Sequence, residues 1–232
     1  MKISDYFDNN NRFSLNDKSA SGNEELIEQF KYGGDHSPKH FLKWQQYNSF
    51  SERGMVFSSH EIAEIIKYGN LYQKNQAQVG NGGEGTVDMD NRRTKVSWIT
   101  PNKWTNFIYD RLLPICNEVN ESDFQYDLTY VETLQFCEYN SNEQGCYNKH
   151  TDMFGGWYSS HTRKLSFVLQ LSDPWEYEGG ELQLWFGEYP TSIQKEKGRL
   201  VFFPSYALHQ VTPVISGVRY SLVGWVHGPA FK

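Results

Sequence analysis

The chain has few of the features that mark a nucleic-acid-binding or membrane protein. Its formal net charge is −6, and it contains no dense block of lysine and arginine that would follow a phosphate backbone. No apolar run reaches the roughly 18 residues that a membrane-spanning helix needs, and no signal-peptide pattern opens the sequence. We therefore expect a cytoplasmic protein that binds neither nucleic acid nor membrane. The sequence does not indicate an oligomeric state.

Cysteine is also scarce. The three cysteines, Cys116, Cys137 and Cys146, are an odd number and lack the spacing of a zinc site. We expect reduced thiols, and we interpret Cys137 as a small apolar core residue because it lies inside a predicted strand.

Aromatic residues, in contrast, are abundant, with 15 Tyr, 15 Phe and 7 Trp. Such residues favour strands and line ligand pockets. The length of 232 residues suits one large domain rich in β-structure. We predict a single domain over residues 1–232, with a polar N-terminal extension over 1–40. Supporting helices and the first strands follow over 41–123, and a β-core over 124–228.

Helical patterns precede this β-core. A short helix is predicted over residues 23–31. Ser58 followed by Glu61 is a capping box that predicts a helix start, and Gly69 is predicted to end that helix.

A strand is predicted over residues 92–99, directly before a further helix. Thr100 and Pro101 are typical of an N-cap and a first helical position, and Pro114 should end or kink the helix.

After about residue 124 the sequence becomes a series of short strands separated by turns. The predicted strands cover residues 128–139, 165–171, 182–186, 199–203, 208–214 and 220–226. The turn signals are Glu178-Gly179-Gly180, Gly198, Pro204-Ser205 and Ser216-Gly217. This spacing predicts a sandwich or a double-sheet jelly roll. The fold class is thus α+β, mainly β, with helices packed on one sheet.

The first candidate site is the His150-Thr151-Asp152 segment. In an extended segment, residues i and i+2 point to the same face, so His150 and Asp152 can present an imidazole and a carboxylate to one point. These are two of the three ligands of a 2-His-1-carboxylate site for non-haem Fe(II). His209, at the start of a strand after a Pro-Ser turn, is the candidate third ligand. Glu181 is a spare carboxylate with poorer spacing to a histidine.

The other histidines have simpler interpretations. His60 is a solvated residue in the first turn of a helix, His161 lies in a polar loop, and His227, which follows the last strand, is a spare candidate. His36 and His40 belong to the N-terminal part.

Arg219 and Ser221 form a candidate anion clamp ten residues after His209. They share one face of a strand, and an arginine fork with a neighbouring hydroxyl suits a carboxylate. Each residue alone is more often structural. Their joint occurrence in this order predicts a metal site with an anion site beside it.

These residues stand in motifs that resemble the Fe(II)- and 2-oxoglutarate-dependent dioxygenases, most closely the prolyl 4-hydroxylase-like and PKHD-type hydroxylase branch. The resemblance covers roughly residues 41–228. Its motifs are Gln135, Tyr139, Gly145-x-Tyr147-x-x-His150-x-Asp152, Arg163-x-Leu165-Ser166, Tyr177-Glu178-Gly179-Gly180-Glu181-Leu182, Phe202-Phe203-Pro204-Ser205, His209-x-Val211-x-Pro213-Val214 and Gly217-x-Arg219-Tyr220-Ser221-Leu222. It implies a double-stranded β-helix core, a cupin-like jelly roll, with flanking N-terminal helices.

The resemblance also implies the cofactors and the reaction. His150, Asp152 and His209 would hold Fe(II), with 2-oxoglutarate and O₂ as cosubstrates and ascorbate as a further cofactor. Decarboxylation of 2-oxoglutarate to succinate and CO₂ would drive hydroxylation of an unactivated C–H bond. Arg219 would bind the distal carboxylate of 2-oxoglutarate.

Further residues complete the implied cosubstrate site. Tyr139 and Ser221 are candidate hydrogen-bond donors, although Tyr139 could also be a packing residue at a strand end. Either Ser166 or Gln170 would supply one more polar group.

The leading substrate is a prolyl residue in a peptide or protein, and a free amino acid or other small metabolite is the alternative. Tyr147, Trp157 and Tyr158 form either a substrate rim or packing around the His-x-Asp segment. Arg92, with its neighbours Arg93 and Lys95, could meet a polar or acidic part of the substrate. A catalytically silent cupin-like module and a zinc site remain as competing interpretations.

Overall fold

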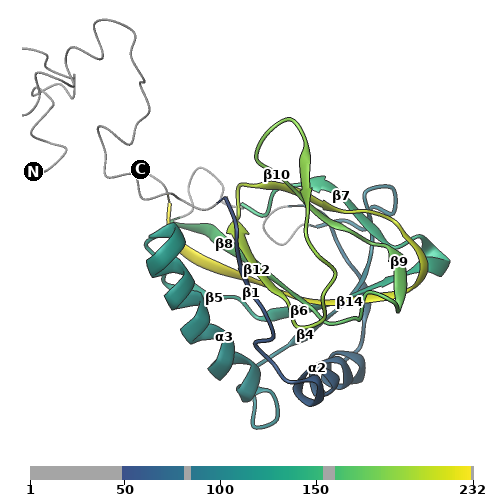
Figure 1. Ribbon diagram of the computed structural model, residues 1–232, viewed down its shortest axis with the longest axis horizontal. Coiled ribbons are helices and arrows are strands. Elements are labelled where there is room, and N and C mark those ends of the chain that lie inside the picture. Colours follow the sequence, from purple (N-terminus) through teal and green to yellow (C-terminus); the bar gives the residue numbers. More distant parts are fainter. Residues whose placement is uncertain (1–48, 81–84, 154–159, 231–232) are drawn as a thin grey trace, which may run out of the picture. The chain divides into compact units, whose positions relative to one another are not determined.

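The computed structural model describes residues 49–80, 85–153 and 160–230 (Figure 1). The helix predicted over residues 23–31 and the extension predicted over 1–40 lie outside the described residues. Among the described residues, no helix has the length and the apolar character needed to cross a membrane.

The described strands form two antiparallel sheets. The larger has nine strands, in the order β1-β12-β8-β14-β6-β4-β2 with β5 and β9 paired to β14, and the smaller has the order β11-β10-β13-β7-β3. The bounds in the larger sheet are β1 Ser51–Arg53, β2 Asn75–Gln76, β4 Lys95–Ile99, β5 Tyr130–Val131, β6 Leu134–Asn140, β8 His161–Gln170, β9 Tyr177–Gly179, β12 Leu200–Pro204 and β14 Val214–Pro229. Those in the smaller sheet are β3 Arg92–Arg93, β7 Cys146–His150, β10 Leu182–Trp185, β11 Pro190–Ser192 and β13 Leu208–Val211.

Helix α2, Ser59–Leu71, begins as predicted and ends later than predicted. Glu61 N–H donates to Ser58 Oγ and Ser58 N–H donates to Glu61 Oε2, which confirms the capping box. The prediction that Gly69 ends the helix is wrong. Gly69 is buried inside the last turn, where a Cβ would lie 2.3 Å from Cγ of Phe136, so the missing side chain serves close packing on the sheet.

Helix α3, Asn106–Val119, begins five residues after the predicted position. Thr105 Oγ1 donates to Thr100 O and accepts from Asn102 N–H, and these bonds close a turn where the helix was expected. Pro114 does not end the helix, which continues to Val119 and then into a π-helix over Asn120–Phe124. The buried side chains on both sides of Pro114 hold the helix against the core.

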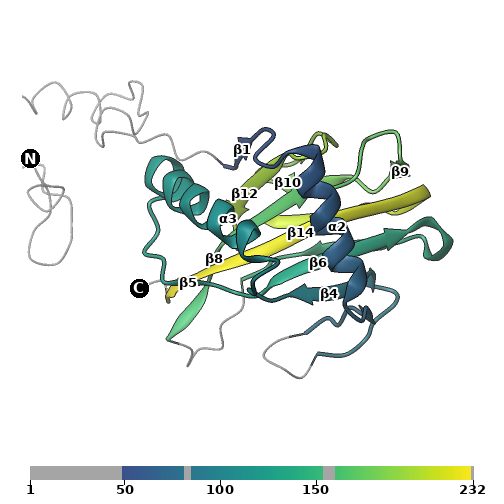
Figure 2. The same cartoon turned by 90° about the horizontal axis from the view of Figure 1, so that it is seen from below.

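The described residues form three layers, namely the helices, the larger sheet and the smaller sheet, with a hydrophobic cluster between each pair of neighbouring layers. One cluster lies between the helices and the larger sheet and contains Ile65, Ile108 and Phe167. Figure 2 shows α2 and α3 lying across the strands of this sheet. The other cluster joins side chains of both sheets, among them Cys137 and Leu184. This double-sheet architecture confirms the predicted fold class, mainly β with flanking helices.

Several predicted strand boundaries are wrong. The strand predicted over 128–139 divides into β5 and β6, and the one predicted over 208–214 ends at Val211. The strand predicted over 92–99 is interrupted at Thr94, whose buried hydroxyl donates to Cys146 O, so that β3 and β4 belong to different sheets. Ser216-Gly217 is not a turn between strands but lies inside the 16-residue β14. A register shift beside Ser216 and a φ of 74° at Gly217 absorb the irregularity.

The cysteine interpretation agrees with the structure. All three cysteines are buried and free, and Cys137 lies in β6 at the centre of the cluster between the sheets. Burial raises the pKa of the Cys116 thiol to about 12, so this residue behaves as an apolar core residue.

The central strand β14 has a glycine that a side chain could not replace. Gly224 pairs with Phe167 of β8, and a Cβ there would lie 2.2 Å from Cζ of that buried ring. We expect Gly224→Ala to lower the free energy of unfolding by about 1–3 kcal/mol, because overpacking displaces the ring. Urea denaturation followed by circular dichroism measures the change. Gly187→Ala is the matched control, since its Cβ would meet no atom within 4 Å. Equal effects of the two changes would contradict this account.

Candidate active site

Three potential metal ligands meet at one point on the inner face of the smaller sheet. Antiparallel pairing of β13 with β7 places His209 directly opposite His150, with ring centroids 4.1 Å apart. Asp152 follows β7 by two residues, and its backbone N–H donates to Ser205 O. Asp152 Oδ2 lies 3.4 Å from His209 Nε2, and Oδ1 lies 3.7 Å from His150 Nε2. One ligand atom from each residue falls within 4.8 Å of the other two.

The hydrogen bonds of the two histidines leave Nε2 available to a metal. His150 Nδ1 lies 2.7 Å from Asn148 O, and His209 Nδ1 lies 2.9 Å from Ala207 O. A carbonyl only accepts, so we assign the ring proton to Nδ1 in both residues. Burial, together with the neighbouring His209, lowers the pKa of His150 to about 3, so this imidazole is neutral at pH 7.

Asp152 is an ionised carboxylate although only 5% of it is exposed. Burial alone would raise its pKa, but His209 and His150 beside it hold the pKa below its ordinary value. The same carboxylate raises the pKa of His209, although burial opposes this change. Ser166 Oγ, on β8 of the larger sheet, donates to Asp152 Oδ2 at 2.9 Å and also contacts Ser205 Oγ.

The three residues fit an Fe(II) ion. Two imidazole nitrogens and one carboxylate oxygen form the 2-His-1-carboxylate donor set. Each of the three side chains is also oriented by a hydrogen bond to a neighbouring group. No fourth His, Cys, Asp or Glu joins this group among the residues of the structure described above. A structural zinc would favour four protein ligands, so the site resembles one with open positions.

The candidate anion clamp lies on the larger sheet, across the cavity. Arg219 of β14 is 1% exposed, and its Nη groups donate to Gln170 Oε1 at 2.9 Å and to Ser221 Oγ at 3.3 Å. Its guanidinium lies 5.1 Å from the centre of the Tyr139 ring, and Nε has no partner. No described Asp or Glu pairs with Arg219. A buried cation in this state fits a carboxylate ligand.

The structure distinguishes the two polar residues that the sequence left unranked. Gln170 contacts Arg219, whereas Ser166 holds Asp152. Both lie on β8, but four residues apart, so Gln170 supports Arg219 and Ser166 supports Asp152.

One cavity between the two sheets connects these groups. Its lining contains the three metal ligands and Tyr139, Arg219 and Ser221. It also contains Gln135 and Trp225, which the sequence reasoning missed as site residues. Both follow the period of two, because Gln135 shares a face of β6 with Tyr139 and Trp225 shares a face of β14 with Arg219. That alternation is the signal that could have found them.

The residues predicted to touch the substrate lie partly within this cavity. The Tyr147 ring stacks on His150 with centroids 3.4 Å apart, and the guanidinium of Arg92 lies 4.3 Å from the centre of the Tyr147 ring. Trp157 and Tyr158 lie outside the described residues.

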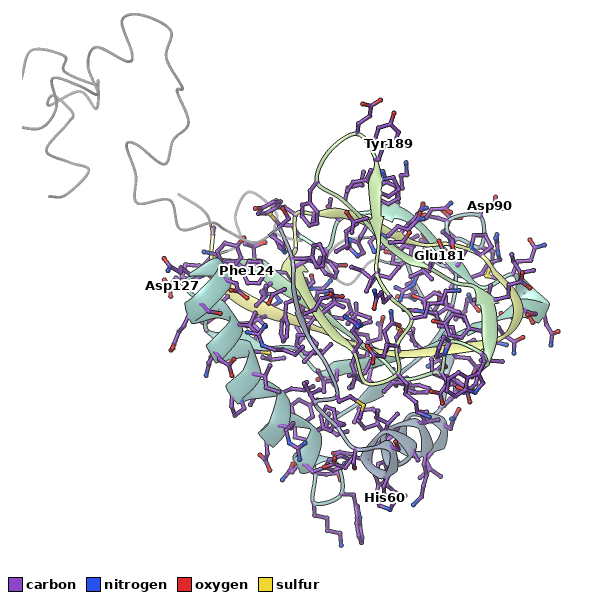
Figure 3. The ribbon with its side chains drawn as sticks, viewed as in Figure 1. His60, Asp90, Phe124, Asp127, Glu181 and Tyr189 are labelled. Atoms are coloured by element: carbon purple, nitrogen blue, oxygen red, sulfur yellow. The ribbon has the colours of Figure 1, made fainter. Side chains whose placement is uncertain are left out.

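The histidines set aside from the sequence are placed elsewhere in the fold. His60 is exposed on α2, and Figure 3 shows it on the helical side of the molecule. His161 begins β8 rather than lying in a loop, and His227 lies inside β14 rather than after it, with Nε2 2.5 Å from Glu132 Oε1. Glu181 accepts a hydrogen bond from Gln183.

Comparison with known proteins agrees with this geometry. The sequence model described as "2OG-Fe(II) oxygenase superfamily" matches residues 134–227. A PKHD-type hydroxylase of Prochlorococcus marinus is 40% identical over 86 residues, which are 37% of this chain and 38% of that protein. Another, from Synechococcus sp. strain CC9605, is 48% identical over 65 residues, which are 28% of this chain and 29% of that protein. The matched segment thus spans less than two fifths of these relatives.

Solved structures share the fold over a longer part of the chain. A prolyl-4-hydroxylase of Pseudomonas putida aligns with a TM-score of 0.63 at 20% identity, covering 77% of this chain and 92% of the other. A prolyl hydroxylase of Trichoplax adhaerens, solved with a hypoxia inducible factor peptide fragment, aligns with the same TM-score at 19% identity, covering 77% and 83%. The resemblance predicted from the motifs is therefore confirmed, since residues 134–227 match the sequence model of the 2OG-Fe(II) oxygenase superfamily.

Proposed function

We propose that the protein is an Fe(II)- and 2-oxoglutarate-dependent dioxygenase. The observation that carries this proposal is the facing arrangement of two buried groups of side chains. One is the donor set of His150, Asp152 and His209, and the other is the unpaired cation Arg219. Bound Fe(II) and 2-oxoglutarate would supply the activation of O₂ and the oxidation of a C–H bond, with release of succinate and CO₂.

The chain's own residues position the reactants and fix which ring nitrogen of each histidine carries the proton. The carbonyls of Asn148 and Ala207 keep the protons of the two histidines on Nδ1, so that Nε2 faces the metal position. Ser166 fixes the carboxylate of Asp152. On the opposite sheet, Arg219, with Ser221 and Gln170, would bind the distal carboxylate of 2-oxoglutarate. The apolar walls of the cavity exclude water from the reacting groups.

We infer that the substrate is a prolyl residue in a peptide or protein. Prolyl hydroxylases share this fold, and one of them was solved with a peptide. A second cavity of about 150 Å³ adjoins the metal site and is lined by Trp98, Trp225 and Tyr147. Its aromatic walls suit an apolar ring such as that of proline. A free amino acid or another small metabolite remains the second candidate, because the cavity is small enough for such a ligand.

The metal site yields the first functional prediction. We expect Asp152→Ala to abolish Fe(II) binding, and Ser166→Ala to weaken it by about 10–100-fold, because a ligand without its supporting hydrogen bond is poorly oriented. Anaerobic equilibrium dialysis measures the affinity. Ser216→Ala is the control, since Ser216 is exposed near the start of β14 and does not line the cavity. Unchanged binding in Asp152→Ala would exclude this metal site.

The candidate anion clamp at Arg219 yields the second functional prediction. Anaerobic addition of Fe(II) and 2-oxoglutarate to the wild-type protein should produce a weak visible charge-transfer band. We expect Arg219→Ala to weaken 2-oxoglutarate binding by tenfold or more, because it removes a charge-assisted hydrogen bond to the distal carboxylate. Fe(II) affinity, measured in parallel, should stay the same. A band that forms with equal 2-oxoglutarate affinity in both proteins would contradict the assignment of Arg219.

Substrate class is tested by succinate release. We expect proline-containing peptides to stimulate 2-oxoglutarate turnover above the substrate-free rate, with a smaller response to free amino acids. Stimulation by free amino acids alone would replace the prolyl proposal by the second candidate. If no peptide stimulates turnover, the prolyl proposal is excluded.

A further inference from the structure

We propose that Arg92 binds a carboxylate group of the substrate, so that the site has a second anion-binding position besides Arg219. This inference rests on the proposed function and names the chemistry that its substrate must carry. The carboxylate comes either from a free amino acid or from an acidic residue next to the hydroxylated residue of a peptide.

Arg92 is a buried cation whose charge has no counterpart. It lies in β3 and is 7% exposed. Nη2 donates to Gln135 Oε1 at 2.8 Å, Nη1 donates to Gln78 O at 3.4 Å, and Nε has no partner. Both acceptors are neutral, and none of the acidic residues that the structure describes forms an ion pair with this guanidinium. A buried charge is costly unless an opposite charge joins it.

Arg92 faces the same connected space as the metal ligands. It lines the cavity of the metal site, the adjoining cavity of about 150 Å³, and a third cavity of about 320 Å³ near Gln76. Its guanidinium stacks on Tyr147, which stacks on the metal ligand His150. A group bound to Arg92 therefore lies beside the reacting centre, with room for the rest of a substrate on the outer side.

The two arginines are held at different positions along β6. On β6, Tyr139 lies opposite Arg219 of β14, whereas Gln135 holds Arg92. Tyr139 and Gln135 are four residues apart, which corresponds to about 13 Å along a strand. A short dicarboxylate held by Arg219 and the metal ligands would lie toward the Tyr139 end of β6, so Arg92 beside Gln135 stays available for a different anion.

The charges of the loaded site support this assignment. Fe(II) with Asp152, the two neutral histidines, the dianion of 2-oxoglutarate and Arg219 sums to zero. Arg92 then leaves one positive charge in the cavity. The other cation at the cavity, Arg163, is already neutralised, because its Nε and Nη2 donate to the two carboxylate oxygens of Glu132. One uncompensated arginine matches a single carboxylate and lacks the several donors that a phosphate group would need.

Matched pairs of ligands that differ only in this charge test the proposal. The pairs are L-proline with L-prolinamide, and N-acetyl-prolyl-aspartate amide with N-acetyl-prolyl-asparagine amide. Each is titrated anaerobically into the Fe(II)- and 2-oxoglutarate-loaded protein, with tryptophan fluorescence as the signal because Trp98 and Trp225 line the cavity. We expect a carboxylate member of at least one pair to bind about tenfold or more tightly than its amide, as a charge-assisted hydrogen bond implies. The pair that responds identifies the source of the carboxylate.

Variants of two neighbouring arginines assign the effect. Arg92→Gln should remove the preference for the carboxylate, and Arg92→Lys should restore part of it. Arg93→Gln is the control, because Arg93 turns outward and donates to the carbonyls of Gln144 and Met89. Thermal unfolding and the charge-transfer band show whether each variant is folded and loaded.

The failures of the two proposals are distinct. Absence of the band in the wild-type protein would refute the dioxygenase assignment. Three results with a normal band would overturn the role of Arg92 alone. Acid and amide could bind equally, no carboxylate member could bind, or the preference for the carboxylate could survive Arg92→Gln.

Discussion

The arrangement of the site depends on how a buried carboxylate is kept ionised. Asp152 is almost inaccessible to water, and an isolated charge in such a place would be strongly unfavourable. Two imidazoles of the smaller sheet and one hydroxyl of the larger sheet compensate it. The β7–β13 pairing, the turn at Ser205 and the approach of β8 are therefore not independent features. Each of them is needed to place a compensating group at the same carboxylate.

The sequence predicted the parts of the molecule that depend on local period and on recognisable motifs. His150 and Asp152 follow from the i, i+2 rule, and their connection to His209 and Arg219 came from the order of the motifs. The capping box at Ser58 is equally local. The errors concern elements that tertiary contacts decide. The late start of α3 follows from hydrogen bonds of Thr105, and the interruption at Thr94 depends on a bond to Cys146, 52 residues away in the sequence.

The basic segment beside Thr94 shows why side-chain roles were harder to predict than positions. Arg92, Arg93 and Lys95 were grouped as residues that could meet an acidic segment. In the folded chain Lys95 pairs with Glu143, and Arg93 bonds to backbone carbonyls outside the cavity, so neither is a buried cation of the site. Only Arg92 turns into the cavity. Charge and proximity in sequence were the same for all three. Alternation along β3 turns Arg92 inward and Arg93 outward, and the change of sheet at Thr94 separates Lys95 from both.

The division of the site between two sheets has a consequence for the cohesion of the fold. Potential metal ligands belong to the smaller sheet, whereas the anion clamp belongs to the larger one. A metal ion and a 2-oxoglutarate bound to each other would form a cross-link between two layers that otherwise adhere mainly through apolar side chains. Ligands that bind only the folded state also stabilise it. Binding of both cofactors would then raise the free energy of unfolding by joining the two sheets at a second kind of contact.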